Sequence, residues 1–122
     1  MKPHLKILCV DDNPDIRVSL QEQFSMEDFE VDTAEDGEFA LQKIKENNYD
    51  LILLDVKMPK MDGLTVLQEI RKLDKNPQVI MLSAVSDVPT AMECVRLGAK
   101  DYISKPYDPE ELLHIVIKLL GS

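Results

Sequence analysis

The fold is decided by the stretch Asp50-Leu51-Ile52-Leu53-Leu54-Asp55-Val56-Lys57-Met58-Pro59. Four large aliphatic residues stand in a row, too few for a helix, and a loop marked by a proline and a glycine follows. Such a run predicts a strand that is buried on both faces and ends at a carboxylate. Asp55 would then lie at the edge where open α/β sheets bind ligands. Considered alone, Asp55 is explained more simply as a turn or capping residue.

The composition is typical of a globular domain with an acidic balance. The chain has 122 residues, 44% hydrophobic and 30% charged, which suits one domain over residues 1–122. Its 23 acidic and 14 basic residues give a formal charge of −9 at pH 7. This charge argues against direct nucleic-acid binding, because affinity for a phosphate backbone comes largely from basic side chains. A cation or a basic protein surface is a better-matched partner.

No membrane or targeting segment is predicted. No apolar run approaches the ~18 residues that span a bilayer, and the first residues do not lead into a signal peptide. Cys9 and Cys94 lack metal-ligand spacing and are too few for a disulfide framework, so both are expected to be buried free thiols. We therefore expect a cytoplasmic protein with no membrane partner.

Four further apolar segments predict the remaining strands. They cover residues 5–10, 29–33, 79–82 and 102–103. Residues 29–33 alternate apolar with charged side chains, which is typical of an edge strand that is half exposed to water.

Helices are predicted between successive strands and after the last one. Asn13-Pro14, Asp36-Gly37 and Asp108-Pro109 mark three helix starts. At the first and the last of these, an Asn or Asp caps free amides and a proline occupies the first turn. Another helix is expected after the loop at residues 57–63. Five strands alternating with five helices predict an α/β fold, a parallel sheet covered on both faces.

The remaining helix is predicted around Pro89. Ser86 is its expected N-cap, and Gly98 is well placed to end it in a left-handed conformation. Met92 and Val95 supply its apolar stripe.

The carboxyl ends of the predicted strands carry a selective set of polar side chains. Because parallel strands point the same way, their ends share one rim, which collects Asp11, Asp12, Asp55, Ser83 and Lys105. Three close carboxylates raise one another's pKa unless a cation neutralises them. Hard oxygen ligands suit Mg²⁺, which usually completes its shell with waters and phosphate oxygens. The sequence therefore predicts a magnesium site poised for a phosphoryl group.

The same residues fit phosphoryl transfer to an aspartate. Such transfer depends mainly on positioning and charge neutralisation, and an aspartate can itself be the acceptor. Asp55 is best placed for this role because it ends the central strand, whereas Asp11 and Asp12 flank the metal from one side. Lys105 can pair with a carboxylate or with a phosphoryl oxygen, and Ser83 can donate a hydrogen bond to another such oxygen. Each residue alone has a structural explanation, so the grouping carries the prediction.

Together these residues resemble the receiver domains of bacterial two-component response regulators, the CheY-like family, over essentially the whole chain. The resemblance rests on Val10-Asp11-Asp12, Leu53-Leu54-Asp55, Met58-Pro59 with Met61-Asp62-Gly63, Ser83-Ala84, Gly98-Ala99 and Lys105-Pro106. It implies a doubly wound, flavodoxin-like sheet with strand order 2-1-3-4-5.

The resemblance also implies a chemistry. Asp55 would accept a phosphoryl group from a phosphohistidine on a sensor histidine kinase or a phosphotransfer protein. Asp12 and Asp55 would bind Mg²⁺ directly, Asp11 would act largely through water, and the backbone carbonyl of Lys57 would be a further ligand.

The resemblance further implies a conformational switch. Ser83 and Lys105 would contact the phosphoryl group, and Tyr102 would be the aromatic whose rotamer follows Ser83. Lys105-Pro106 would be a cis peptide. Phosphorylation would shift a pre-existing balance of conformations. The fourth helix, fifth strand and fifth helix would form the output face, contacting an output domain, another protein or a second copy in a homodimer. Tyr102 is explained equally well as a half-buried strand aromatic.

Two residues differ from those of a short-lived chemotaxis-type switch. Lys57 and Val85 stand two residues after Asp55 and Ser83, where a small amide and an acid would help to orient an attacking water. They predict a slowly hydrolysing acyl phosphate. Alternatively, both residues are simply exposed.

Three other functions compete with the receiver interpretation. A haloacid-dehalogenase-like phosphatase needs a second Asp where Lys57 stands. A flavodoxin-like electron carrier needs a phosphate loop rich in Ser, Thr and Gly, whereas residues 11–14 repel phosphate without a metal. A degenerate receiver would lack part of the acid set, which here is complete. Both a stand-alone relay and a receiver from a longer regulator fit the sequence.

Overall fold

A computed structural model of the chain describes residues 5–84 and 88–121. In these ranges five strands alternate with five helices. The strands are β1 (Lys6–Val10), β2 (Glu30–Ala34), β3 (Leu51–Asp55), β4 (Gln78–Ser83) and β5 (Asp101–Ser104). The helices are α1 (Pro14–Ser25), α2 (Gly37–Glu46), α3 (Gly63–Lys72), α4 (Val88–Arg96) and α5 (Pro109–Gly121). The predicted α/β alternation is therefore confirmed, and each strand bound lies within about one residue of its predicted position.

The strands form one parallel sheet in the order β2-β1-β3-β4-β5. This is the order that the resemblance implied. Strand β2 lies at an edge and is largely part-exposed, as its alternating pattern predicted. The residues of β3 are all buried, because helices cover both faces of the sheet at its centre.

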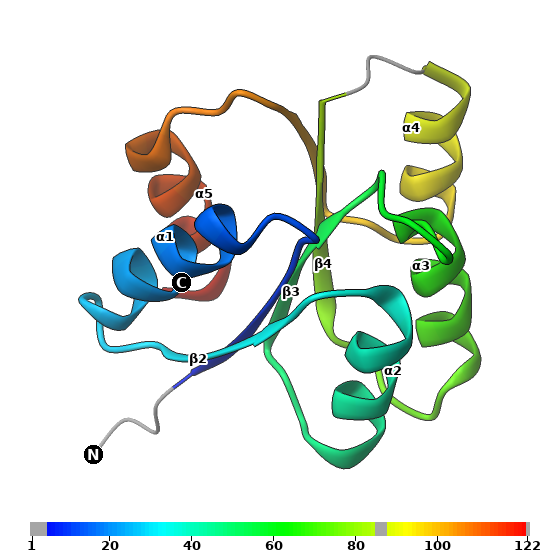
Figure 1. The fold of residues 1–122 in the computed structure, drawn as a ribbon, viewed down its shortest axis with the longest axis horizontal. Helices are drawn as coiled ribbons and strands as arrows, with labels where there is room; N and C mark the ends of the chain where they lie inside the picture. The colour runs from blue at the N-terminus through cyan, green and yellow to red at the C-terminus, as the bar shows by residue number, and fades with distance from the viewer. Residues whose placement is uncertain (1–4, 85–87, 122) are drawn as a thin grey trace.

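Two helical layers enclose the sheet. Figure 1 shows α1 and α5 on one side and α2, α3 and α4 on the other. Side chains of the central strands alternate between these two layers. In β1, Ile7 and Cys9 pack into the core with α1 and α5, whereas Leu8 and Val10 pack into the core with α2 and α3. Burial on both faces explains why the strands appear in the sequence as continuous apolar runs.

Polar side chains fix the starts of four helices. Asn13, Asp36, Asp62 and Asp108 each accept a hydrogen bond from a backbone amide in the first turn that follows, at 2.8–3.0 Å. Because the first amides of a helix have no intrahelical acceptor, these oxygens stabilise the turn that leaves the sheet. The helix starts after β1 and β3 are thereby anchored next to the strand ends.

Helix α4 differs from the prediction in the face that it buries. The periodicity predicts Met92 and Val95 as its packing stripe, but these side chains are 67% and 61% exposed, whereas Cys94 is fully buried. This part of the prediction was wrong because the helix carries two apolar stripes, and periodicity does not tell which of them faces the sheet. Gly98 follows the helix with φ 87°, as predicted. Ser86, the predicted cap, lies outside the described residues.

The two cysteines follow the prediction. Cys9 and Cys94 are buried free thiols. Among residues 5–84 and 88–121, no helix has both the length and the apolar character needed to span a bilayer.

Candidate functional site

Three acidic side chains converge where β1 and β3 end. The two strands pair in register, with Val10 opposite Leu54, so Asp11 and Asp55 occupy equivalent positions at the carboxyl ends. The carboxylates of Asp11, Asp12 and Asp55 offer oxygen atoms that all lie within 4.8 Å of one another. The structure therefore brings together the three acids that the sequence predicted would share one rim.

The three acids differ in their access to solvent. Asp11 and Asp55 are buried, with 2% and 4% of their surface exposed, whereas Asp12 is exposed. A cation can therefore approach from the side of Asp12 and meet two carboxylates that are largely withdrawn from water.

Lys105 supplies the positive charge at this rim. Its Nζ donates a hydrogen bond to Asp11 Oδ2 at 2.6 Å and lies 3.4 Å from Asp55 Oδ1. The sequence predicted that Lys105 pairs with a carboxylate, and the structure identifies Asp11 as its nearer partner. The Lys105-Pro106 peptide is cis, as the resemblance implied. One ammonium group faces three carboxylates, so negative charge remains in excess.

The pKa of Asp55 is raised by its surroundings at this rim. Burial raises the pKa of Asp55 to about 6, and the neighbouring Asp11 adds to the increase. Lys105 lowers this pKa through its charge and a hydrogen bond, and so does the backbone N–H of Lys57, which donates to the carboxylate. The net increase means that the ionised carboxylate is destabilised where it stands. Three hard oxygen donors with unbalanced charge fit Mg²⁺, because a divalent cation would relieve that repulsion.

The ends of β4 and β5 complete the rim. Ser83 is fully buried at the end of β4, and its carbonyl accepts a hydrogen bond from the Lys105 amide at 2.7 Å. This bond ties the predicted hydroxyl donor to the residue that carries the ammonium group. Tyr102 lies one strand further out, half-buried in β5 against the core shared with α2 and α3. That position fits both of its predicted roles, so the switch role stays a prediction.

The loop after β3 carries the residue predicted to govern hydrolysis. The side chain of Lys57 is exposed. Its backbone amide contacts the Asp55 carboxylate, which places this segment beside the predicted acceptor. Its carbonyl as a metal ligand stays a prediction. Val85, the second residue of that hypothesis, lies outside the described residues.

Sequence reasoning assigned Gly63 to a loop and to the motif that carries the resemblance, and the structure shows that it packs directly on the end of β3. A Cβ at this position would lie 2.3 Å from the Asp55 carbonyl oxygen and 2.8 Å from Val56 Cα. The Gly63 amide also donates to the Val56 carbonyl at 2.7 Å. Only glycine permits this close approach, which holds the start of α3 against the end of β3.

Two further residues near the rim escaped prediction because no local pattern marks them. Arg17 donates from Nη1 to the backbone carbonyl of Asp11 at 2.8 Å. Tyr107 lines a hollow of about 400 Å³ together with Lys105. Burial raises the pKa of Tyr107 to about 12, with Asp11 as the largest electrostatic contribution. Only the folded chain brings these side chains to the acids.

The sequence is similar to those of known signalling proteins. The sequence model of the response regulator receiver domain matches residues 7–117. Regulatory protein AtoC of Escherichia coli (strain K12) is 39% identical over 115 residues, which are 94% of this chain and 25% of that protein. Chemotaxis protein CheY of Bacillus subtilis (strain 168) is 37% identical over 117 residues, which are 95% of this chain and 98% of that protein. The chain thus spans about a quarter of the first relative and nearly all of the second.

A solved structure supports the same comparison at the level of the fold. Response regulator protein TrrA of Thermotoga maritima, in complex with Mg²⁺ and BeF, superposes with a TM-score of 0.84 at 43% sequence identity. The match covers 95% of this chain and 99% of that chain.

Proposed function

The chain belongs to the family of response regulator receiver domains, and from this premise we propose that it is a phosphoacceptor switch in which Asp55 is the acceptor. One observation carries the proposal. The buried Asp55 carboxylate ends the central strand beside two further acids, and one of its oxygens lies 3.4 Å from the Lys105 ammonium. This arrangement supplies a nucleophile and a counter-charge for phosphoryl oxygens at the same place.

In the proposed reaction, a carboxylate oxygen of Asp55 attacks the phosphorus of a phosphohistidine on a sensor histidine kinase or a phosphotransfer protein. The new P–O bond forms as the P–N bond breaks, and the departing imidazole nitrogen takes a proton from solvent. Attack requires the ionised carboxylate. Because the pKa of Asp55 is about 6, most of it is ionised at pH 7 and above.

Asp11, Asp12 and Asp55, with the backbone carbonyl of Lys57, would hold Mg²⁺ during this reaction. When bound, the ion supplies positive charge to the carboxylates and to the phosphoryl oxygens. The relative TrrA, solved with Mg²⁺ and BeF, supports this assignment because it is 43% identical to the chain. Lys105 contacts a second phosphoryl oxygen, since its ammonium already lies between two of the acids.

The signal would leave through the face formed by α4, β5 and α5. Ser83 donates to the phosphoryl group, and Tyr102 follows its movement on the neighbouring strand. Helix α4 supports this assignment because Val88, Met92 and Val95 expose an apolar stripe, each with more than about 60% of its surface accessible. A downstream output domain or protein, or a second copy in a homodimer, covers this stripe in the active state.

Hydrolysis of the acyl phosphate would be slow. The exposed Lys57 and the residue Val85 offer neither the amide nor the acid that would orient an attacking water. The chain catalyses only its own phosphorylation and this slow loss, and it is otherwise a signalling domain. The double variant Lys57→Asn with Val85→Glu should shorten the lifetime of the phosphorylated chain, measured by intact mass over time. An unchanged lifetime would contradict the assignment of these two residues.

Intact-mass spectrometry tests the proposed acceptor directly. The chain is incubated with Mg²⁺ and a small acyl-phosphate donor, and one phosphoryl adduct is expected. The adduct should be absent from Asp55→Asn and retained in Asp50→Asn, which changes an exposed acid just before the other end of the same strand. Absence of an adduct on the folded native chain, or its persistence in Asp55→Asn, would refute the proposed function.

A further inference from the structure

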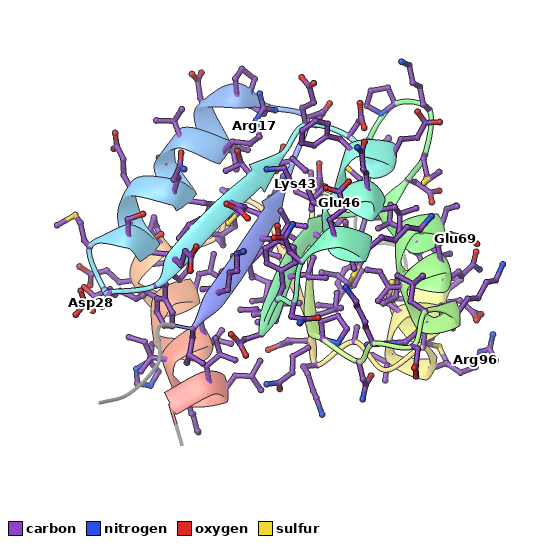
Figure 2. The ribbon with its side chains drawn as sticks, turned by 90° about the horizontal axis from the view of Figure 1, so that it is seen from below. Arg17, Asp28, Lys43, Glu46, Glu69 and Arg96 are labelled. Atoms are coloured by element: carbon purple, nitrogen blue, oxygen red, sulfur yellow. The ribbon has the colours of Figure 1, made fainter. Side chains whose placement is uncertain are left out.

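Arg17 connects helix α1 to the acidic rim. It is the fourth residue of α1, and its guanidinium donates from Nη1 to the Asp11 carbonyl at 2.8 Å. Figure 2 shows Arg17 near the end of α1 that lies toward the arrowhead of β2, where the strands end. Asp11 is only 2% exposed, and a buried carbonyl that has left the sheet needs another donor. Arg17 supplies that donor.

Arg17 contacts the residues on both sides of Asp12 in the sequence. All three oxygen atoms of Asp11 accept hydrogen bonds: Oδ1 from the Asn13 amide at 2.9 Å, Oδ2 from Lys105 at 2.6 Å and the carbonyl from Arg17. The backbone amide of Arg17 also donates to the Asn13 carbonyl at 3.1 Å. Arg17 therefore binds the residue before Asp12 with its side chain and the residue after Asp12 with its main chain.

We infer that Arg17 is a positioning residue for the metal centre. Its hydrogen bonds hold the turn at residues 11–13 in place, so that the carboxylate of Asp12 faces the cation. The inference rests on the proposed function. Asp12 is exposed, so the direction of its carboxylate depends on the backbone that carries it. A guanidinium group suits this task because it stays charged and its planar donors hold a fixed direction.

The sign of the effect separates positioning from simple electrostatics. Arg17 is a cation near a site for another cation, so on charge alone its removal would strengthen Mg²⁺ binding. If Arg17 positions Asp12, its removal frees the turn and weakens Mg²⁺ binding instead. Loss of a residue that orients a metal ligand typically lowers affinity about 10- to 100-fold. Arg17 acts through the backbone, so we expect the lower end of this range, about tenfold.

Isothermal titration calorimetry of the unphosphorylated full chain with Mg²⁺ alone tests the inference. Arg17→Met removes the donor and keeps the apolar stem, and Arg17→Gln replaces the group with a shorter neutral one. Arg96→Met is the matched control, because Arg96 is an exposed arginine of α4 that pairs with Glu93 on its own helix. Thermal unfolding of each variant shows which of them is folded at the titration temperature.

An increase of about tenfold in the Kd for Mg²⁺ in a folded Arg17 variant, with the control unchanged, supports the positioning role. If Arg17→Met does not fold, Arg17→Gln decides by the same criterion. An unchanged or lower Kd overturns the inference even where the Tm falls, because the contact would then only stabilise the fold. In that case native binding of Mg²⁺ leaves the proposed function standing. A native chain that binds no Mg²⁺ overturns the metal centre and the inference together.

Discussion

Replacing Asp55 with Asn is expected to stabilise the folded chain at neutral pH. Burial raises the pKa of Asp55 to about 6 from an ordinary value of 3.8, and Asp11 adds to the increase. Lys105 and the Lys57 amide oppose this increase without cancelling it. The folded state therefore holds an ionised carboxylate at a position that disfavours its charge. An asparagine keeps the shape of the side chain and removes that charge.

The size of the effect follows from the size of the shift. About two pKa units correspond to about 3 kcal/mol, at 1.36 kcal/mol for each unit. This shift already includes the opposing attraction of Lys105. Because the rim opens to water beside Asp12, solvent screening reduces the effect, and we expect a gain in the free energy of unfolding of about 1–3 kcal/mol. For a chain of 122 residues this gain corresponds to an increase in Tm of about 3–10 °C.

The effect has a defined pH dependence. Between the unfolded and folded pKa values of Asp55, the folded state retains a proton that the unfolded state has lost, so stability falls as pH rises. The destabilisation by Asp55 is complete above the folded value of about 6 and absent below the unfolded value of 3.8. The advantage of Asn should therefore be largest above about pH 6 and disappear as the pH falls toward about 4.

Urea denaturation without Mg²⁺, followed by circular dichroism across this pH range, measures the difference. Asp74→Asn is the control because it makes the same charge change at an exposed acid. An Asp55→Asn variant no more stable than the native chain at about pH 7.5, or a gain that persists at about pH 4, would refute the reasoning.

Three further substitutions test a packing contact and two sets of hydrogen bonds around the sheet, each by urea denaturation. Gly63→Ala should destabilise the fold by about 3 kcal/mol, because its Cβ would lie 2.3 Å from the Asp55 carbonyl oxygen; native-like stability would contradict the clash. Lys75→Met should cost about 1–3 kcal/mol, because Nζ donates at 2.7–3.0 Å to three carbonyls at the end of α2. An unchanged midpoint would show that water replaces these bonds. Tyr49→Phe should cost about 1 kcal/mol through loss of its 2.7 Å hydrogen bond to Asp32, and a stabilised variant would contradict this.

Most of the fold could be predicted because its signals are local. A central strand covered on both faces must be apolar at every position, as residues 51–54 are, and this pattern survives without knowledge of any partner. The helix starts could also be predicted, because the side chains of Asn13 and Asp108 accept hydrogen bonds from amides only two residues away. The inward face of α4 could not be predicted, because the choice between Cys94 and Met92 depends on how the helix docks against the sheet.

The meeting of the acids at one site could be predicted from the topology of the sheet. The contacts that hold these acids in place could not. Parallel strands bring their carboxyl ends to one rim, so Asp11 and Asp55 had to meet once the sheet was inferred. Lys105 and Arg17 both bind Asp11, from which they are separated by 94 and 6 residues in the sequence. No periodicity of the sequence indicates that these side chains reach the same residue. Sequence therefore identified the charges of the site, and the structure was needed to show what holds them.

These restraints explain how a repulsive cluster persists in a stable fold. Carboxylates that repel one another would move apart if the backbone could yield, and the pKa of Asp55 would then return toward its ordinary value. Gly63 packs against the Asp55 carbonyl from α3, while Arg17 and Lys105 hold Asp11 at its carbonyl and its carboxylate. The cluster is thus fixed from both faces of the sheet. The rim keeps its excess charge in place, so a divalent cation or a phosphoryl group bound there would change forces that reach α1, α3 and β5 together.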